Sequence, residues 1–455
     1  MSEWKKVKIG DFLTEREGRY KPNDKEISKY QRLDKIDFSG HIYISDKPTK
    51  TDMIIVFPGD LIISGINVAK GAISVYQGKE PVCATIHYSS YTFDDKKVDL
   101  DYFKYFVKSP AFIFALQQQV KGGIKTEIKP KHLLPLEISL PDLSTQKEIV
   151  KVLSKKIEKV ELIKSEIESQ KAYAKQLRQN ILQEAIEGKL TEEWRKKNPV
   201  VKGNPDFDAE ALFEKIQEEK CHTDSELPLE TSLRIRNSKK KVFEPIAENE
   251  QPFEIPEGWK WVKLEHLAEV GTGATPLTSE KKYYENGTIP WITSSSTGND
   301  FVSKADVFIT EIALKETNCS LNPKGTLVVA MYGQGKTRGQ ITELCIEAAT
   351  NQACATIKIF EKDNVVLKKY IKFVFKKMYE EIRSLAQGGT QPNLNLGKIA
   401  NTIFPLPPLA EQKEIVSRVE KLLANVTELE KQITEREEMT KQLMQSIMKD
   451  AFREK

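Results

Sequence analysis

The pentapeptide Gln-Lys-Glu-Ile-Val stands at Gln146–Val150 and again, 266 residues later, at Gln412–Val416. The same offset pairs Leu140-Pro141 with Leu406-Pro407. A repeat of this period is too long for a solenoid unit, whose periods reach roughly 50 residues. The chain is therefore predicted to be two copies of one module, and this predicts two similar contacts with whatever the protein binds.

A long helical pattern begins at each pentapeptide. The first follows Pro141, with Thr145 and Glu148 at capping-box spacing, and Gly188 is its predicted C-cap. Each pattern lasts about 45 residues, or about 65 Å. A helix of this length with a narrow apolar stripe needs a partner. The alternatives are a coiled coil between two chains and pairing within one chain. Because the two stripes match in length and position, pairing within one chain is favoured.

A globular stretch precedes each helix. Short strand-like runs recur at Leu61–Ile63 and Leu327–Val329, and again at Cys83–Ile86 and Cys354–Ile357. A segment with helical periodicity and aromatic apolar positions follows in both copies. The predicted fold class is α+β, with two similar globular domains separated by two long antiparallel helices. These helices are predicted to form an intramolecular coiled coil with pseudo-two-fold symmetry.

Five segments follow from this pattern. The connector between the copies has no counterpart in the first copy, and it carries an amphipathic helical stretch at Ala209–Glu219. The predicted boundaries are 1–143 for the first globular domain, 144–190 for the first long helix, 191–256 for the connector, 257–408 for the second globular domain and 409–455 for the second long helix.

Composition limits the class of protein. The 455 residues are 39% hydrophobic and 30% charged, as expected of a soluble globular protein. No run approaches about 18 consecutive apolar residues, so no transmembrane span is expected, and the N-terminus is not predicted to be a signal peptide. Five scattered cysteines without a Cys-x-x-Cys pair predict reduced thiols, a cytoplasmic location and no zinc site. The net charge of +4 does not by itself indicate a nucleic-acid binder.

One segment, Ala330–Thr337, fits a relaxed phosphate-loop pattern. A phosphate loop must open a helix, so that its N–H groups meet the phosphates, but Arg338–Thr342 is hairpin-like. The matching first-copy slot, residues 64–71, lacks Gly-Lys-Thr. The favoured interpretation is a turn that presents basic side chains. No methyltransferase motif, metal-ligand spacing or catalytic triad is present, so no catalytic, cofactor-binding or metal-binding residue is predicted.

The remaining clusters suit DNA. Residues 120–131 place four lysines beside a Gly-Gly turn, whereas the matching residues 388–395 carry amides. Lysine suits phosphates, while Gln and Asn can read adenine edges. One scaffold with two different readouts is the hypothesis that follows. The predicted DNA contacts are Arg32, Lys35, Asn67, Lys70 and Lys125 in the first domain, and Ser294, Ser296, Tyr332, Gln334, Lys336, Arg338, Gln391 and Asn393 in the second.

These motifs resemble those of a known family, the specificity subunits of type I restriction–modification systems. The residues that carry the resemblance are Leu140–Val150, Leu406–Val416 and Gly188–Arg195. The family pattern covers essentially the whole chain. One departure is Ser144-Thr145 in the first copy where the second has Ala410-Glu411, which is interpreted as a capping change.

The resemblance implies a non-catalytic subunit that reads double-stranded DNA at a bipartite, asymmetric target through two target-recognition domains. Two modification subunits would dock on the helices and supply S-adenosylmethionine, and restriction subunits would use ATP and Mg. The helix pair would hold the half-sites at a fixed separation, as dimers do. The competing hypotheses are a nucleotide-dependent enzyme that uses Gly335–Thr337 and a purely structural coiled-coil scaffold.

Overall fold

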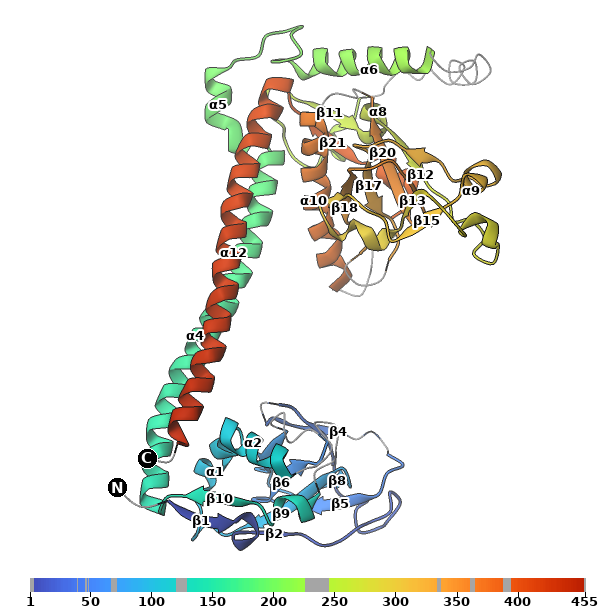
Figure 1. Cartoon of the computed structure of the whole chain (residues 1–455). Helices are drawn as coiled ribbons and strands as arrows, with labels where there is room; N and C mark the ends of the chain where they lie inside the picture. Colours follow the sequence, from blue (N-terminus) through green and yellow to red (C-terminus); the bar gives the residue numbers. More distant parts are fainter. Residues whose placement is uncertain are drawn as a thin grey trace. The chain divides into compact units, whose positions relative to one another are not determined.

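A computed structural model describes residues 4–38, 40–45, 47, 49–66, 72–119, 129–225, 245–333, 337–360, 365–387 and 394–453 (Figure 1). The chain divides into two compact units, one of Met1–Gln170 with Gln432–Lys455 and one of Lys171–Lys431. The five predicted segments do not coincide with these units, because each long helix contributes to both.

Among its described residues, the first unit contains three sheets. Its elements are β1 (Lys5–Lys8), η1 (Ile9–Asp11), β2 (Leu13–Glu15), β3 (Arg32–Ile36), β4 (Ile42–Ser45), β5 (Met53–Val56), β6 (Leu61–Ser64), β7 (Ile73–Val75), β8 (Val82–Thr85), β9 (Tyr88–Phe93), α1 (Leu100–Phe106), α2 (Pro110–Gln119), α3 (Pro130–Leu133) and β10 (Glu137–Leu140). The sheet orders are β2-β9-β6-β7, β4-β3-β8-β5 and the pair β1-β10.

The second unit repeats this plan, with five strands in place of four in one of its sheets. Before its sheets come η3 (Lys189–Thr191), α5 (Glu192–Lys197), α6 (Ala209–Ser225) and η4 (Glu248–Glu250). The globular elements are β11 (Lys260–Lys263), α8 (Leu264–Leu267), β12 (Ala268–Thr272), η5 (Lys281–Tyr283), β13 (Ile289–Ile292), η6 (Ser294–Gly298), β14 (Phe301–Val302), β15 (Val307–Ile309), α9 (Glu311–Glu316), β16 (Leu321–Asn322), β17 (Leu327–Ala330), β18 (Ile341–Leu344), β19 (Ala348–Thr350), β20 (Cys354–Ile359), α10 (Val365–Gln387), α11 (Leu396–Ala400) and β21 (Ile403–Leu406). The sheet orders are β12-β20-β17-β18-β14, β15-β13-β19-β16 and β11-β21.

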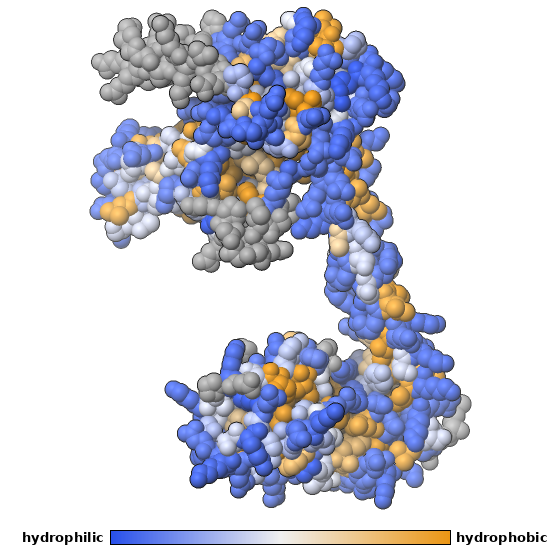
Figure 2. Space-filling model, turned by 180° about the vertical axis from the view of Figure 1, so that it is seen from behind, coloured by the Kyte–Doolittle hydropathy of each residue, from blue (hydrophilic) through white to orange (hydrophobic). Residues whose placement is uncertain are grey.

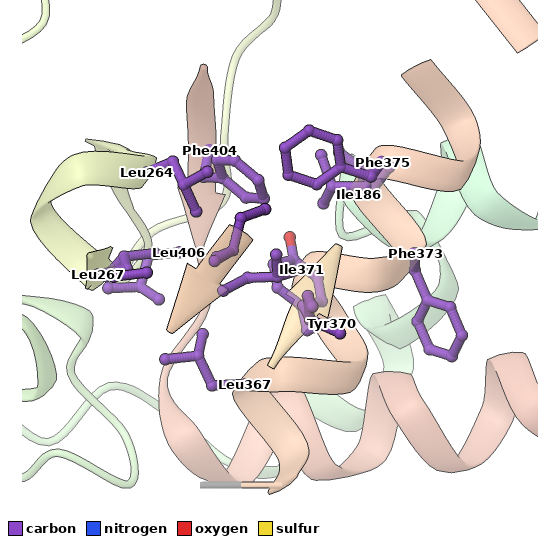
Figure 3. Packing of buried hydrophobic residues seen from close by; sticks show 14 of the residues in the cluster. Ile186, Leu264, Leu267, Leu367, Tyr370, Ile371, Phe373, Phe375, Phe404 and Leu406 are labelled. Atoms are coloured by element: carbon purple, nitrogen blue, oxygen red, sulfur yellow. The ribbon is translucent and has the colours of Figure 1, made fainter. Parts of the chain in front are cut away.

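The two copies share strand register. Lys5 pairs with Leu140 between β1 and β10, and Lys260 pairs with Leu406 between β11 and β21. In each unit this strand pair leads directly into a long helix. The core of the second unit lies between α10, β21 and α8, where the Tyr370 hydroxyl donates to the Pro405 carbonyl at 2.7 Å. Figure 3 shows Tyr370 and Ile371 of α10 in the same buried cluster as Phe404 and Leu406 of β21. The α+β class is confirmed.

The long helices are α4 (Leu143–Ile186) and α12 (Leu409–Ala451), and they pair antiparallel. In the first unit Leu153 of α4 shares a core with Met448 and Phe452 of α12, and in the second Ile181 shares a core with Val419. Both buried stripes recur every seven residues, the spacing of a coiled coil: Leu153, Val160, Ile167, Ala174 and Ile181 on α4, and Val419, Val426, Ile433 and Thr440 on α12. The predicted intramolecular coiled coil is confirmed.

The helix ends correct one prediction and confirm another. Asp142, not Thr145, caps α4, because its carboxylate accepts the Thr145 N–H at 2.8 Å. An aspartate directly after Pro141 is already well placed to satisfy a free N–H of the first turn. At the other end Gly188 has a φ of +72°, the left-handed conformation typical of a residue that terminates a helix.

The side chain of Glu411, in the first turn of α12, contacts residues that are distant in the sequence. Its carboxylate is buried and accepts hydrogen bonds from Thr191 Oγ1 and from Trp259 Nε1, both at 2.7 Å. It also forms an ion pair with Arg195, whose guanidinium donates to the Gly188 carbonyl at 2.9 Å. The departure from Thr145 in the first copy is therefore not a simple capping change. Through these contacts, the Glu411 side chain connects α5 and Trp259, which directly precedes β11, to α12.

None of the helices in the described part of the chain is long and apolar enough to cross a membrane.

Candidate nucleic-acid interface

The Gly-rich segment of the second unit connects two strands. Ala330 N–H donates to the Gln340 carbonyl at 2.9 Å, and Gly339 N–H donates back to the Ala330 carbonyl at 2.8 Å. Gly339 has a φ of +84°, which glycine adopts without strain. The segment thus joins β17 to β18 as a hairpin, as predicted. Since a strand begins at Ile341, the helix N-terminus that a phosphate loop needs does not follow it.

A short 3₁₀ helix, η6, lies against this hairpin. Buried Thr297 of η6 donates to the Ser294 carbonyl at 2.7 Å and lies 3.3 Å from Gln340 Oε1. Ser294 and Ser296 are half-buried, while Ser295 between them is exposed. The structure therefore brings the predicted serines beside the hairpin turn, and Ser295 is the most exposed residue of the three.

Tyr332 and Arg338 lie on the two sides of the same turn. The Tyr332 side chain is 43% exposed, and Arg338 is half-buried. The end of α10 supports this turn, because a Cβ on Gly339 would lie 3.3 Å from Ile382 Cδ1. The turn and η6 thus present four predicted contacts together. Gln334, Lys336, Gln391 and Asn393 lie outside the described residues.

Three lysines on one face of α10 hold the neighbouring strands, a role that sequence reasoning missed. Lys368 pairs with Glu343 at 2.8 Å, and Lys376 pairs with Asp300 at 2.6 Å. Between them Lys372 donates to the Asp300 carbonyl, with Nζ 3.9 Å from the centre of the Phe301 ring. The four-residue spacing, which puts all three on one helix face, was the available signal.

This cluster shifts two pKa values. Burial lowers the pKa of Lys372, although Asp300 acts in the opposite direction. Burial alone would raise the pKa of Asp300, but Lys376 and Lys372 together hold it below its usual value. The Lys368–Glu343 pair is largely shielded from water, with side chains 18% and 16% exposed, whereas the Asp300 side chain of the other pair is 57% exposed.

In the first unit the predicted contacts are arranged differently. Arg32 of β3 pairs with Asp34 at 2.7 Å, and its side chain is only 15% exposed. Lys35 is exposed, with its Nζ 4.5 Å from the centre of the Tyr43 ring on β4. The same hairpin carries both, and Lys35 is the more accessible. Asn67, Lys70 and Lys125 lie outside the described residues.

The helices carry a second kind of surface. Three exposed apolar residues of α4 have exposed apolar counterparts on α12 at the repeat offset of 266, and apolar side chains interrupt the hydrophilic surface along the helices in Figure 2. In the first unit we call Ile163, Met439 and Leu443 patch A. In the second unit we call Leu429, Tyr173 and Leu177 patch B. Each residue of patch A is the repeat equivalent of one residue of patch B.

Two similar α+β modules, each continuous with one of two paired helices, define a class of duplicated recognition proteins. The chain belongs to the family described as the type I restriction modification DNA specificity domain, whose model matches residues 1–170 and 256–438.

Individual relatives agree with the family. The chain is 32% identical over 171 residues to the type I restriction enzyme MjaIX specificity subunit of Methanocaldococcus jannaschii, covering 36% of this chain and 37% of that protein. It is 25% identical to the EcoDI specificity subunit of Escherichia coli, covering 73% of this chain and 65% of that one. The EcoKI specificity subunit of Escherichia coli K12 is 22% identical, with 88% and 75% covered. The matches to the first two relatives thus span less than two thirds of each relative's length.

Two solved structures share the fold. A chain from a type I R-M system, solved in work on complex assembly and conformational transition, has a TM-score of 0.62 at 14% identity and covers 99% of this chain and 98% of its own. The HsdS subunit from Thermoanaerobacter tengcongensis has a TM-score of 0.50 at 16% identity, with 99% and 97% covered. At these identities the likeness shows the fold alone.

Proposed function

We propose that this chain is the DNA-reading subunit of a type I restriction–modification complex. It recognises double-stranded DNA at a bipartite, asymmetric target and performs no catalysis itself. The observation that carries the proposal is that the two copies share a backbone scaffold but expose different polar and charged side chains. The β1–β10 and β11–β21 pairs have the same register. Lys35 beside Tyr43 marks the first copy, whereas η6 with Tyr332 and Arg338 marks the second.

Side-chain type supports reading of base edges as well as binding of phosphates. Arginine can make paired hydrogen bonds to guanine, and hydroxyls can serve as donor or acceptor in the major groove. Lysine supplies phosphate contacts that fix position without reading sequence. A copy rich in hydroxyls and amides and a copy rich in lysines would therefore read two different half-sites.

The helix pair suits two identical partners. Patches A and B have equivalent residues, and exposed apolar patches of this kind are typical of protein interfaces. Buried Gln146 and Gln412 also make the same bond, to the carbonyls of Pro141 and Pro407 at 2.8 Å in both copies. We infer that two modification subunits dock here. They would bring S-adenosylmethionine, and the restriction subunits would use ATP and Mg, so this chain would need no cofactor. We place the complex in the cytoplasm.

The proposal is tested by selection from random DNA. The chain, purified with its modification partner, is incubated with duplexes of randomised sequence, and the retained duplexes are sequenced. Two short specified runs separated by a fixed number of unspecified bases are expected. Retention without any sequence preference would refute DNA reading and favour a structural scaffold.

The nucleotide-dependent alternative is tested separately. The hairpin between β17 and β18 provides no helix N-terminus for phosphates. The purified chain alone should therefore hydrolyse no ATP above the rate of a Lys336→Ala variant. Hydrolysis that is lost in this variant would establish the alternative.

A further inference from the structure

One surface is built alike in both copies. It consists of the strand pair β1–β10 with η1 in the first unit, and β11–β21 with α8 in the second. Ile9 N–H donates to the Leu136 carbonyl at 3.0 Å, and Leu264 N–H donates to the Thr402 carbonyl at 2.9 Å. These equivalent bonds place Lys5, Val7 and Asp11 where Lys260, Val262 and His266 stand in the second copy.

In the second copy a helix covers this surface. Leu212, Phe213 and Ile216 of α6 are buried in one core cluster with Val262 and the leucines of α8. This is the apolar face of an amphipathic helix.

Polar contacts fix α6 at both ends of this face. Glu210 pairs with Lys260 at 2.6 Å, and Lys260 Nζ lies 5.2 Å from the centre of the Phe213 ring. Gln217 Nε2 donates to the His266 carbonyl at 2.7 Å. Apolar contacts and the carboxylate of Glu210, near the N-terminus of α6, therefore hold this helix on the surface.

In the first copy the same place is an open cavity. Its volume is ≈ 420 Å³, and Val7 is partly exposed where Val262 is buried. We call this cavity the first-copy groove, and its lining includes Lys5, Val7, Asp11, Lys97 and Asp142.

The lining of the groove carries two lysines and two aspartates, and Lys5 is the cation that stands in the position of Lys260. Lys5 is exposed, whereas Lys97 forms an ion pair with Asp94 at 3.4 Å. The two carboxylates of the lining accept backbone N–H groups, Asp11 from Lys8 at 2.9 Å and Asp142 from Thr145 at 2.8 Å. Lys97 donates to the Asp11 carbonyl at 2.8 Å, the place that Gln217 takes in the second copy.

We propose that the first-copy groove is a docking site for an amphipathic helix of a partner chain, built like α6. Such a helix would present apolar residues at the spacing of Leu212, Phe213 and Ile216, with a carboxylate at the place of Glu210 to meet Lys5. Helix-in-groove docking is a recurring mode of peptide recognition. The seat that α6 occupies in the second copy identifies the kind of partner, independently of any role in DNA reading.

The probe for the test is α6 itself, supplied as a separate peptide. A fluorescent peptide of residues 205–222 is cross-linked between positions 214 and 218, which are exposed on α6. The cross-link is needed because short helices are marginal in water. The full-length chain is titrated against it and fluorescence anisotropy is recorded. In the second copy, the chain's own α6 should exclude the peptide from the equivalent surface, because tethering gives α6 an effective concentration of the order of millimolar.

Saturable binding in the micromolar range is expected. Lys5→Glu should weaken binding about tenfold, the size of one lost charge contact, and a peptide carrying Glu210→Lys should restore it. Val7→Asp should abolish binding. Lys6→Glu is the matched control, because Lys6 lies on the opposite face of β1 and is also exposed. It should change affinity less than twofold. Absence of saturable binding, or binding that Lys5→Glu leaves unchanged, would overturn the proposal.

Discussion

Arg436 on α12 donates a hydrogen bond of 2.8 Å to Gln170 on α4, and the two residues occupy the same position in the two copies of the repeat, 266 residues apart. When equivalent positions of an antiparallel pair touch, the contact marks a local two-fold axis. The residues one heptad away, Ile163 and Leu177 on α4 and Leu429 and Leu443 on α12, are exposed and apolar. At these four positions the two copies therefore match in exposed apolar chemistry as well as in register.

A symmetric deletion tests whether this pair sets the half-site spacing. Removing residues 164–170 and 430–436 together keeps the seven-residue phase, because one full heptad leaves each helix, and it spares every residue of patches A and B. The pair should shorten by about 10 Å at 1.5 Å per residue, or about three base pairs at roughly 3.4 Å each. Selection from random duplexes should yield the same two half-sites with a correspondingly shorter gap. An unchanged gap would refute a ruler made of these helices.

The two docking patches should act separately. Leu177→Asp in patch B should reduce the number of bound modification subunits from two to one, and so should Leu443→Asp in patch A, because a buried carboxylate opposes apolar docking. The double variant should bind none, as measured by native mass spectrometry. Leu162→Asp is the control. Leu162 is 66% exposed, but its repeat equivalent is Glu428, so it belongs to neither patch. Loss of both partners in a single variant would contradict two independent sites.

Removing the Glu411 carboxylate should destabilise the second unit. Glu411→Ala leaves Arg195 and the Trp259 indole without their buried acceptor, a change that costs about 3–5 kcal/mol for a broken buried ion pair. The thermal transition of the second unit should fall accordingly in calorimetry. Thr145→Ala, at the equivalent first-copy position, should shift the transition of the first unit by less than about 1 kcal/mol. Equal shifts would contradict the role given to Glu411.

The Asp300–Lys376 pair should make stability depend on pH in acid. Because the lysines hold the pKa of Asp300 below its unfolded value, the stabilisation is present above the unfolded pKa and is lost as pH falls through the folded pKa. Asp300→Asn should cost at most about 1 kcal/mol at pH 7, because the Asp300 side chain is 57% exposed and solvent screens the pair. The difference from the parent protein should shrink as pH falls below about 4.

Thermal denaturation at pH 7 and pH 3 checks this dependence. Glu285→Gln serves as the control, because the Lys281–Glu285 pair is exposed and exposed pairs contribute little. A difference between Asp300→Asn and the parent that stays the same at both pH values would contradict the assignment.

Periodic features of the sequence predicted the structure best. The seven-residue recurrence of Leu153, Val160 and Ile167 follows from local spacing alone, and so does the hairpin at Gly339. Glu411 could not be interpreted in this way. Its partners Thr191 and Trp259 lie 220 and 152 residues away, so only the folded chain brings them together.

The same limit applies to the predicted contacts. Arg32 and Lys35 are both basic residues of one short segment, yet Arg32 forms an ion pair with Asp34, whereas Lys35 is exposed. Side-chain type identified candidates, but accessibility depends on neighbours across strands that no single sequence reveals.

Methylome sequencing of a host that carries this chain with its modification partner tests the central claim most directly. The parent chain should yield one asymmetric motif with two specified parts and a fixed gap. Replacing Lys336 and Arg338 together with Ala should relax one part only, by about 1–3 kcal/mol of discrimination for each lost base contact. Lys35→Ala, in the other copy, should leave that part intact. A contiguous motif, or equal loss of both parts in the Lys336 and Arg338 variant, would contradict a chain that reads two half-sites with two separate copies.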